Sequence, residues 1–278
     1  MTLVVPFPVF DPVAVAVGPL AIRWYALAYI AGIVLGWAYG RWLLRRDSLW
    51  GARPRPTLAE FDDMLTWVTL GVVIGGRLGF VFLYMPGYYV QHPLEALMIW
   101  HGGMAFHGGL AGVIVAVLIV SRAKKLSPLA MFDLLGVVVP IGLFFGRIAN
   151  FINGELWGRT SEVAWAMVFP GAGPEPRHPS QLYQAALEGV ALFVILAIAV
   201  RMGGLKRPGL CLGLFGAGYG VARIIGEFFR QYDPQIGLIF DVITMGQILS
   251  IPMVLVGGAF IWRALRRPAA AAAPQSAA

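Results

Sequence analysis

The sequence predicts an all-α polytopic integral membrane protein with seven transmembrane helices. Of 278 residues, 59% are hydrophobic and a further 35 are glycine, whereas only 13% are charged. Seven apolar stretches each have about 20 residues, the length that crosses a bilayer as a helix. Lys and Arg gather in alternate loops between these stretches. Because a soluble globule of this size carries roughly twice this charged fraction, a soluble enzyme and a disordered chain are both excluded as the default class.

The predicted helices follow from the apolar stretches in order. They cover about residues 19–43, 62–84, 103–121, 130–151, 181–200, 209–229 and 239–262. The third and the sixth are rich in glycine, which membrane helices tolerate better than soluble helices do. We expect residues 1–267 to form one membrane domain with small loops on the outer face. The Ala- and Pro-rich segment 268–278 is expected to be a disordered tail.

The distribution of positive charge orients the chain. The loops after the first, third, fifth and seventh stretches carry fourteen Lys and Arg residues, and the loops on the other side carry three. Positive loops face the cytoplasm, so the N-terminus is predicted to lie outside and the C-terminus inside. An even number of spans would place positive clusters on both sides of the membrane.

Four further arginines fall within the predicted spans: Arg23, Arg77, Arg147 and Arg223. An arginine at membrane depth is costly and usually faces a polar cavity or a partner. Arg23 lies near a span end and is expected to extend to the interface, and Arg77 is open to a structural ion pair. Arg147 and Arg223 have polar neighbours that favour a functional role.

The single cysteine, Cys211, excludes an intrachain disulfide, and no Cys/His cluster has metal-ligand spacing. We therefore expect no metal site. Asp133 and Glu188 also lie in or near predicted spans, with no partner evident from the sequence.

Residues 100–109 form the first polar segment and hold two His-Gly-Gly units six residues apart. The histidine pKa suits proton transfer near neutral pH. For His101 we favour a hydrogen-bonded helix cap. For His107, which is deeper in the apolar run, we favour a functional role.

The second polar segment ends the fourth span on the outer side. Arg147, Asn150 and Gly154 share one helix face, and Gly154 is expected to break the helix and leave Glu155 in a loop. A guanidinium beside amides suits a phosphate or carboxylate. The alternative is a helix end held by hydrogen bonds and an Arg–Glu pair.

The third polar segment lies in the sixth span. Tyr219, Arg223, Glu227 and Arg230 share one helix face, and Arg223 and Glu227 are placed to neutralise each other in part. An additional anionic partner and a purely interhelical ion-pair network both explain this face. With Tyr25, at the outer end of the first span, the three segments converge on the outer half of the bilayer. They predict a basic pocket that water reaches from outside.

These segments resemble the bacterial prolipoprotein diacylglyceryl transferase family from about Phe7 to Arg263. Gln184 departs from the resemblance, because it stands where the family often has Glu. The matching motifs are His107-Gly108-Gly109-Leu110, Gly146-Arg147, Asn150 to Arg159, Arg177 to Tyr183, Tyr219-Gly220 with Arg223, Glu227 to Arg230, and Met245 to Ser250.

The resemblance implies a transferase of the bacterial cytoplasmic (inner) membrane, with its active site toward the periplasm. Its lipid substrate is phosphatidylglycerol and its protein substrate is the lipobox segment of a prolipoprotein. The lipobox cysteine thiol takes the diacylglyceryl group as a thioether, and glycerol 1-phosphate is released. This is the first step of lipoprotein maturation, and it requires no cofactor.

The resemblance also implies the role of each site residue. Arg147 and Arg223 stabilise the leaving phosphate. His107 is the candidate base for the thiol, although a thiolate stabilised by arginine is an alternative. The substrate-binding set comprises Tyr25, Asn150, Gly154, Glu155, Tyr219, Glu227 and Arg230, among which Glu155, Glu227 and Arg230 are expected to hold the arginines in place.

A different class stays open: an outward-facing transporter or binding protein for an anionic solute or lipid also explains arginines within spans. Transporters usually carry internal repeats. In this sequence the only internal similarity found is short, Gly76-Arg77-Leu78 with Gly146-Arg147-Ile148. An odd number of spans also argues against two equal halves.

Overall fold

The computed structural model describes residues 5–8, 10–11, 13–18, 20–232 and 242–269. The larger helices are α1 (Trp24–Leu44), α3 (Leu58–Leu83), α5 (Phe106–Ala123), α6 (Pro128–Ile152), α8 (Leu192–Arg201), α9 (Leu210–Glu227) and α10 (Met245–Leu265). Shorter helices are α2 (Asp47–Trp50), α4 (Pro86–Gln91), η1 (Pro93–Leu97), η2 (Ile99–His101), α7 (Ser180–Gln184), the π-helical turn η3 (Ala185–Ala191) and η4 (Gly204–Lys206). Four strands complete the described elements: β1 (Val5–Pro6), β2 (Val13–Val17), β3 (Leu20–Arg23) and β4 (Met167–Val168).

Seven helices in the described part of the chain are long and apolar enough to span a membrane, which confirms the predicted number. The fifth span is continuous from Ser180 to Arg201 and contains α7, η3 and α8. The seventh begins at Met245, and the predicted start near residue 239 lies outside the described residues. Most of the tail predicted at 268–278 lies outside them as well.

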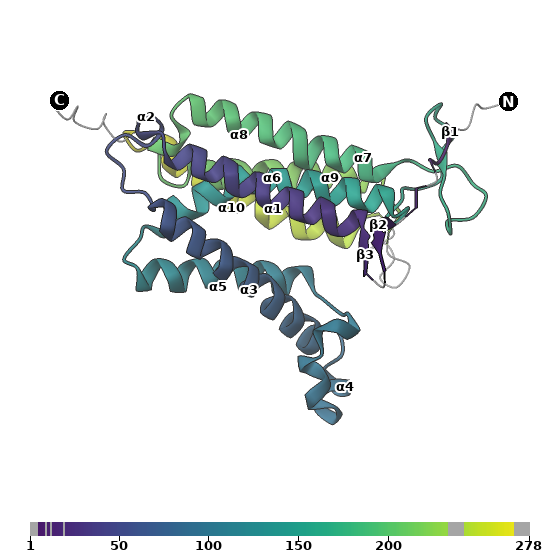
Figure 1. Ribbon diagram of the computed structural model, residues 1–278. Coiled ribbons are helices and arrows are strands. Elements are labelled where there is room, and N and C mark those ends of the chain that lie inside the picture. Colours follow the sequence, from purple (N-terminus) through teal and green to yellow (C-terminus); the bar gives the residue numbers. More distant parts are fainter. Residues whose placement is uncertain (1–4, 9, 12, 19, 233–241, 270–278) are drawn as a thin grey trace.

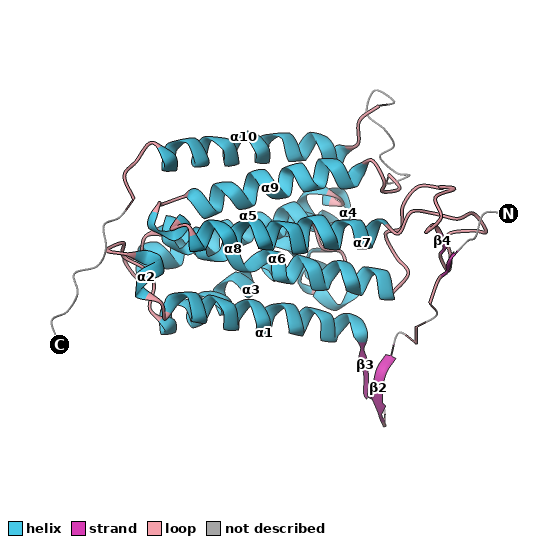
Figure 2. Ribbon diagram, turned by 90° about the horizontal axis from the view of Figure 1, so that it is seen from above, coloured by secondary structure: helices cyan, strands magenta, loops and turns pink. Residues whose placement is uncertain are grey.

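Helix α6 is at the centre of the bundle. It contacts α1, η3, α8 and α9, and α10 packs along the other side of α9. Figures 1 and 2 show these helices running roughly parallel to one another, with the strands at the end near the N-terminus and α2 at the other end.

A separate two-helix unit, the α3–α5 unit, projects from this bundle in Figure 1. Its helices pack mainly against each other, because glycines on both let the backbones approach closely. A Cβ atom added at Gly112 would lie 1.9 Å from the Gly71 carbonyl oxygen, and one at Gly108 would lie 2.2 Å from that of Gly75. No larger side chain fits there without separating the helices.

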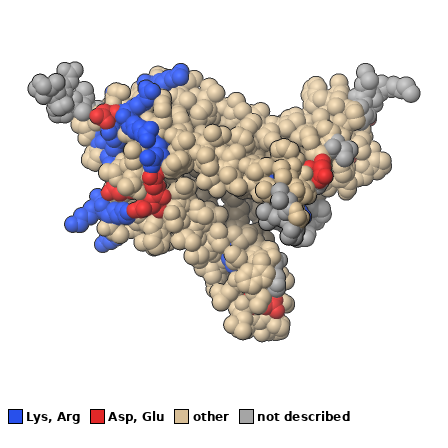
Figure 3. Space-filling view, in the orientation of Figure 1, with Lys and Arg blue, Asp and Glu red and all other residues tan. Residues whose placement is uncertain are grey.

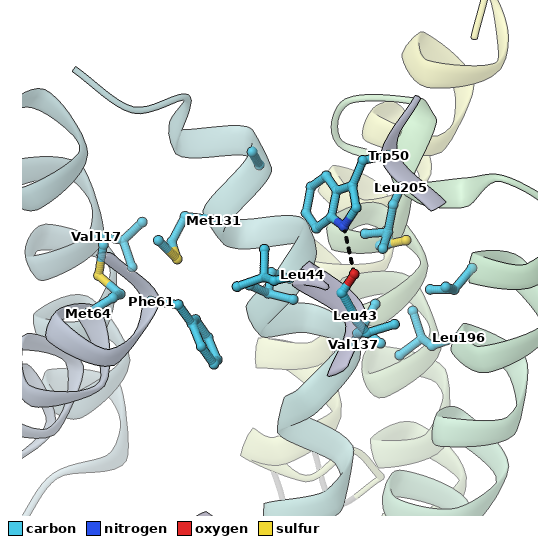
Figure 4. Packing of buried hydrophobic residues seen from close by; sticks show 14 of the residues in the cluster. Leu43, Leu44, Trp50, Phe61, Met64, Val117, Met131, Val137, Leu196 and Leu205 are labelled. Carbon is cyan, nitrogen blue, oxygen red and sulfur yellow. Dashed lines mark hydrogen bonds between the residues drawn. The ribbon is translucent and has the colours of Figure 1, made fainter. Parts of the chain in front are cut away.

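The buried apolar core lies toward the end of the bundle that carries α2 (Figure 4). There, Trp50 donates from its indole Nε1 to the Leu43 carbonyl oxygen at 3.1 Å. Arg53 pairs with Asp133 at 2.9 Å and donates to the Leu205 carbonyl at 2.7 Å. Asp133 in turn accepts from the backbone N–H groups of Gly209 and Leu212, each at 2.8 Å, so a carboxylate on α6 caps the start of α9. The sequence left this carboxylate without a partner, and the fold supplies three.

The opposite end carries short strands that the all-α prediction did not include. β1 pairs with β4 in parallel, and β2 pairs with β3 as an antiparallel hairpin directly before α1. Arg77 is buried below η1 and η2, and its guanidinium donates to the carbonyl oxygens of Glu95, Ala96 and Gly102. The prediction of a structural ion pair for Arg77 is therefore wrong, because its guanidinium binds backbone carbonyl oxygens rather than a carboxylate.

Charged side chains are distributed unevenly over the surface. In Figure 3, Lys and Arg gather at the end of the molecule that carries α2, and the visible surface of the opposite end is almost free of them. The described N- and C-terminal segments lie at opposite ends of the bundle (Figure 1). Terminal segments at opposite ends are expected for a chain with an odd number of spanning helices.

Candidate functional site

The C-terminal end of α6 presents two polar side chains one turn apart, Arg147 and Asn150. The helix ends at Ile152, and Gly154 has a φ of 64°, a conformation that favours glycine. Glu155 therefore lies beyond the helix, as predicted. This turn brings its carboxylate back to Asn150, whose Nδ2 donates to Glu155 Oε1 at 2.8 Å.

An ionic network joins α6, η3 and α9 within the bundle. Arg147 donates from Nε and Nη2 to Glu188 Oε2 at 3.0 and 2.9 Å. On the other side of this carboxylate, Arg223 Nη1 lies 3.8 Å from Glu188 Oε1. Arg223 also pairs through Nη2 with Glu227 Oε1 at 2.6 Å, and Arg230 reaches the same oxygen at 3.2 Å. The two arginines that the sequence singled out thus share one carboxylate, Glu188.

Glycines bring the elements of this network together. A Cβ at Gly189, next to Glu188, would lie 2.6 Å from the Phe144 Cβ, so η3 packs directly on α6. A Cβ at Gly246, in the first turn of α10, would lie 2.8 Å from the Glu227 carboxyl carbon. The predicted motif around Met245 and Gly246 therefore covers the carboxylate that pairs with Arg223 and Arg230.

The network is shielded from solvent and carries a net positive charge. The Glu188 side chain is fully buried, and those of Arg147 and Arg223 are 17% and 16% exposed. Three guanidinium groups face two carboxylates, which leaves one positive charge uncompensated within the network. Burial lowers the pKa of Arg230, and the neighbouring charge of Arg223 lowers it further. An anion that enters this site would complete its charge balance.

A second cluster of hydrogen-bonding side chains lies beside the network, near α1. The Tyr25 and Tyr29 hydroxyls are 3.1 Å apart, and Tyr25 lies beside Asn150 and Glu155. The side chain of Gln181 donates to the Glu155 backbone carbonyl at 2.6 Å. Glu155 was expected to hold an arginine in place, but in the structure its side chain holds Asn150 instead.

A large apolar cavity of about 710 Å³ lies between the α3–α5 unit and helices α6, α9 and α10. Tyr219, which is buried one turn before Arg223, lines it, together with Phe106, Leu143 and Phe215. The cavity continues past Gly257 to Phe260 near the other end of α10. The ionic network and a long apolar space therefore meet at Tyr219.

His107 is not joined to the arginines. It lies in the first turn of α5, is exposed, and makes an edge contact with the Phe106 ring. No hydrogen bond or ion pair links it to any residue that the structure describes. Its neighbours Phe106 and Gly109 line the cavity, so His107 flanks the cavity and is not buried in it.

One further feature of the site was not predicted from the sequence. Glu188 was recognised only as a polar residue without a partner, yet it is at the centre of the network. The signal was present, because a carboxylate within a membrane span is costly unless a partner such as a cation pairs with it. Cys211 is buried in the first turn of α9, about 18 Å along the helix from Arg223, and so lies apart from the site.

Fold and site together define a polytopic membrane protein whose spanning helices hold a buried network of arginines and carboxylates beside an apolar cavity. The family model for prolipoprotein diacylglyceryl transferase matches residues 12–263. Relatives named phosphatidylglycerol–prolipoprotein diacylglyceryl transferase resemble the chain over nearly its full length. The protein of Methylocella silvestris is 57% identical over 269 residues, which cover 97% of this chain and 99% of the relative.

Two further relatives with the same name are comparably similar. That of Rhodopseudomonas palustris is 57% identical and covers 98% of this chain and 97% of its own length. That of Rhizobium meliloti is 54% identical and covers 97% and 96%. The chain belongs to the prolipoprotein diacylglyceryl transferase family.

Proposed function

We propose that this protein transfers the diacylglyceryl group of phosphatidylglycerol to the lipobox cysteine thiol of a prolipoprotein. It is a transferase, as the names of its relatives state of them. The thiol sulfur forms a bond to the terminal glyceryl carbon of the diacylglyceryl group. The bond from that carbon to the phosphate oxygen breaks, and the oxygen keeps the electron pair. The thiol proton is released, and glycerol 1-phosphate leaves.

The observation that carries this proposal is the junction of the ionic network with the apolar cavity. The substrate is a single negative phosphodiester attached to two acyl chains, and the site offers one uncompensated positive charge beside a long apolar space. An inorganic or sugar anion would use the charge and leave the apolar cavity without a role. A phospholipid uses both.

Arg147 and Arg223 stabilise the charge that develops on the leaving phosphate, in surroundings that exclude most water. Tyr25, Asn150 and Tyr219 bind oxygen atoms of the glycerol or phosphate. Glu227 and Arg230 hold Arg223 in place, and Gly154 allows the turn that positions Glu155 beside Asn150. His107, at the edge of the cavity, takes the thiol proton.

The protein functions in the bacterial cytoplasmic (inner) membrane, with the site open to the periplasmic side. The uneven distribution of Lys and Arg supports this orientation, because the positive end is the one that carries α2. The N-terminus is then outside and the C-terminus inside. Lipid reaches the site from the outer leaflet, and the prolipoprotein presents its cysteine from the same side.

The test uses the purified full chain in lipid nanodiscs that contain phosphatidylglycerol. A lipobox peptide is added, and mass spectrometry scores the thioether product. We expect product with the cysteine peptide and none with the same peptide carrying serine. Arg223→Gln should abolish the product, whereas Arg266→Gln, at the opposite end of the molecule, should preserve it. Absence of product from the folded wild-type protein would refute the proposal.

A further inference from the structure

Glu188 has an unusual position for a carboxylate. It is fully buried within a membrane-spanning segment, in the middle of the π-helical turn η3. Such turns are rare and occur mostly at functional sites. Together with the close approach that Gly189 allows, the turn places Glu188 between Arg147 on α6 and Arg223 on α9.

The two sides of this carboxylate differ. Oε2 accepts two hydrogen bonds from Arg147, whereas Oε1 and Arg223 Nη1 are 3.8 Å apart. Within the described part of the chain, neither of these two buried atoms has a hydrogen-bond partner. A substrate oxygen bound by Arg223 Nη1 would therefore lie close to Glu188. Glu188 contacts the same two guanidinium groups that would bind the substrate phosphate. Its negative charge would therefore repel the bound phosphate.

The charges around Glu188 explain why an anion site would contain such a group. The charged neighbours are Arg147 from α6, Arg223 and Glu227 from α9, and Arg230 just beyond α9. With Glu188 the network carries one net positive charge, and without it the network would carry two. The substrate diester carries one negative charge. The product is a phosphate monoester, whose second pKa is about 6, so it carries nearly two at neutral pH.

Resting on the proposed function, we propose that Glu188 is a positioning residue that matches the charge of the site to the phosphodiester substrate and weakens retention of the monoester product. It also holds the Arg147 guanidinium in place through two hydrogen bonds to its Oε2 atom. The site then balances the incoming diester, and the second negative charge of the product finds no cation of its own. Release of the product is favoured as a result.

The test compares two water-soluble probes by isothermal titration calorimetry at neutral pH. Glycerol 1-phosphate is the monoester, and glycerophosphoglycerol is the diester headgroup of the substrate without acyl chains. Glu188→Gln keeps the shape of the side chain and removes its charge. We expect this variant to bind the monoester about tenfold more tightly relative to the diester than the wild type does. Glu188→Asp keeps the charge and should retain the wild-type ratio even where shortening the side chain lowers transfer.

A second variant changes the charge in the opposite direction. Gln184 is buried one turn before Glu188 and packs against Gly226, next to Glu227. Gln184→Glu should weaken binding of the monoester relative to the diester. This result is decisive if Glu188→Gln fails to fold.

Several results would overturn the inference. They are an unchanged ratio in folded Glu188→Gln, an unchanged ratio in Gln184→Glu where Glu188→Gln does not fold, or no binding of either probe to the wild type. The transfer assay is scored separately on the same preparation. Probe binding without thioether product would refute the proposed function, whereas thioether product with an unchanged ratio would refute the role of Glu188 alone.

Discussion

The protein compensates the charge of its membrane arginines in two different ways. Arg77 donates to backbone carbonyl oxygens, which carry no net charge, and it serves to hold the η1–η2 loop on α3. Arg147 and Arg223 instead face carboxylates whose total charge falls short of that of the arginines. Of these three arginines, only Arg223 has a buried nitrogen, Nη1, without a hydrogen-bond partner in the described part of the chain. Depth in the membrane alone therefore does not distinguish an arginine held by the backbone from one that can bind a ligand.

At Arg147 the shape of the cation matters as well as its charge. Its Nε and Nη2 atoms both contact Glu188, a geometry that the single ammonium of lysine does not reproduce. We expect Arg147→Lys to lower kcat/KM by about 10- to 100-fold, the effect of losing one charged hydrogen bond worth about 1.5–3 kcal/mol. Steady-state kinetics with phosphatidylglycerol nanodiscs measure this. Wild-type turnover in the lysine variant would show that a point charge suffices.

His107, in the first turn of α5 at the edge of the cavity, is the proposed base for the thiol. If it is the base, His107→Asn should lower the transfer rate by about 10²–10⁴-fold while lipid binding is kept, because the arginines are intact. Raising the pH toward the free thiol pKa of about 8.5 should partly rescue the variant, since the thiol then ionises unaided. The pH–rate profile and lipid binding are measured on one preparation. Equal losses of binding and rate, with no alkaline rescue, would assign His107 a structural role.

Much of this site was predictable from helical spacing, because residues three, four and seven apart on one helix share a face. This spacing found Arg147 with Asn150, and Arg223 with Glu227 and Arg230. It did not find Glu188 as the shared partner, because contacts between helices depend on packing and on a π-helical turn that shifts the register. The pairing of Glu155 with Asn150 was missed for a similar reason: the path of the chain after Gly154 decides it.

Among the elements, the α3–α5 unit depends on glycine contacts for its cohesion. Gly112→Val would place side-chain atoms where the Gly71 backbone lies and would force the helices apart. We expect a loss of about 1–3 kcal/mol in stability, seen as a lower thermal unfolding midpoint in detergent. The matched control is Gly258→Ala on α10, where an added Cβ meets no atom within 4 Å. Equal midpoints for Gly112→Val and the wild type would show that the contact does not stabilise the unit.

The spanning helices were the most predictable elements, because length and hydropathy alone define them. The short strands and the η1–η2 loop were not, since Arg77 and the pairing of β1 with β4 hold these segments from residues distant in sequence. Hydropathy also does not distinguish a π-helical turn from an α-helical one, so the irregular part of the fifth span was read as regular.

At the scale of the whole molecule, the charge asymmetry predicts one orientation in the membrane. In a Cys211→Ala background, Glu162→Cys lies in the loop between β4 and the end of α6, and Arg122→Cys lies at the positive end of α5; both positions are exposed. A membrane-impermeant maleimide applied to intact spheroplasts should label the first cysteine and leave the second unlabelled until the membrane is opened. The reverse pattern would place the site on the cytoplasmic side.

The cap on α9 has a consequence for the order in which the protein is made. The N–H groups of Gly209 and Leu212 bond to Asp133, and Asp133 is itself paired with Arg53. A ribosome completes Arg53 and Asp133 long before it reaches residue 209, so the acceptor of these N–H groups is already in the bilayer when the sixth span arrives. This span carries two charged residues of the site, Arg223 and Glu227. When it enters the membrane, Asp133 is already present to accept hydrogen bonds from its first turn. The ionic network, which begins with Arg147 and Glu188 on earlier spans, is therefore completed only when the sixth span arrives.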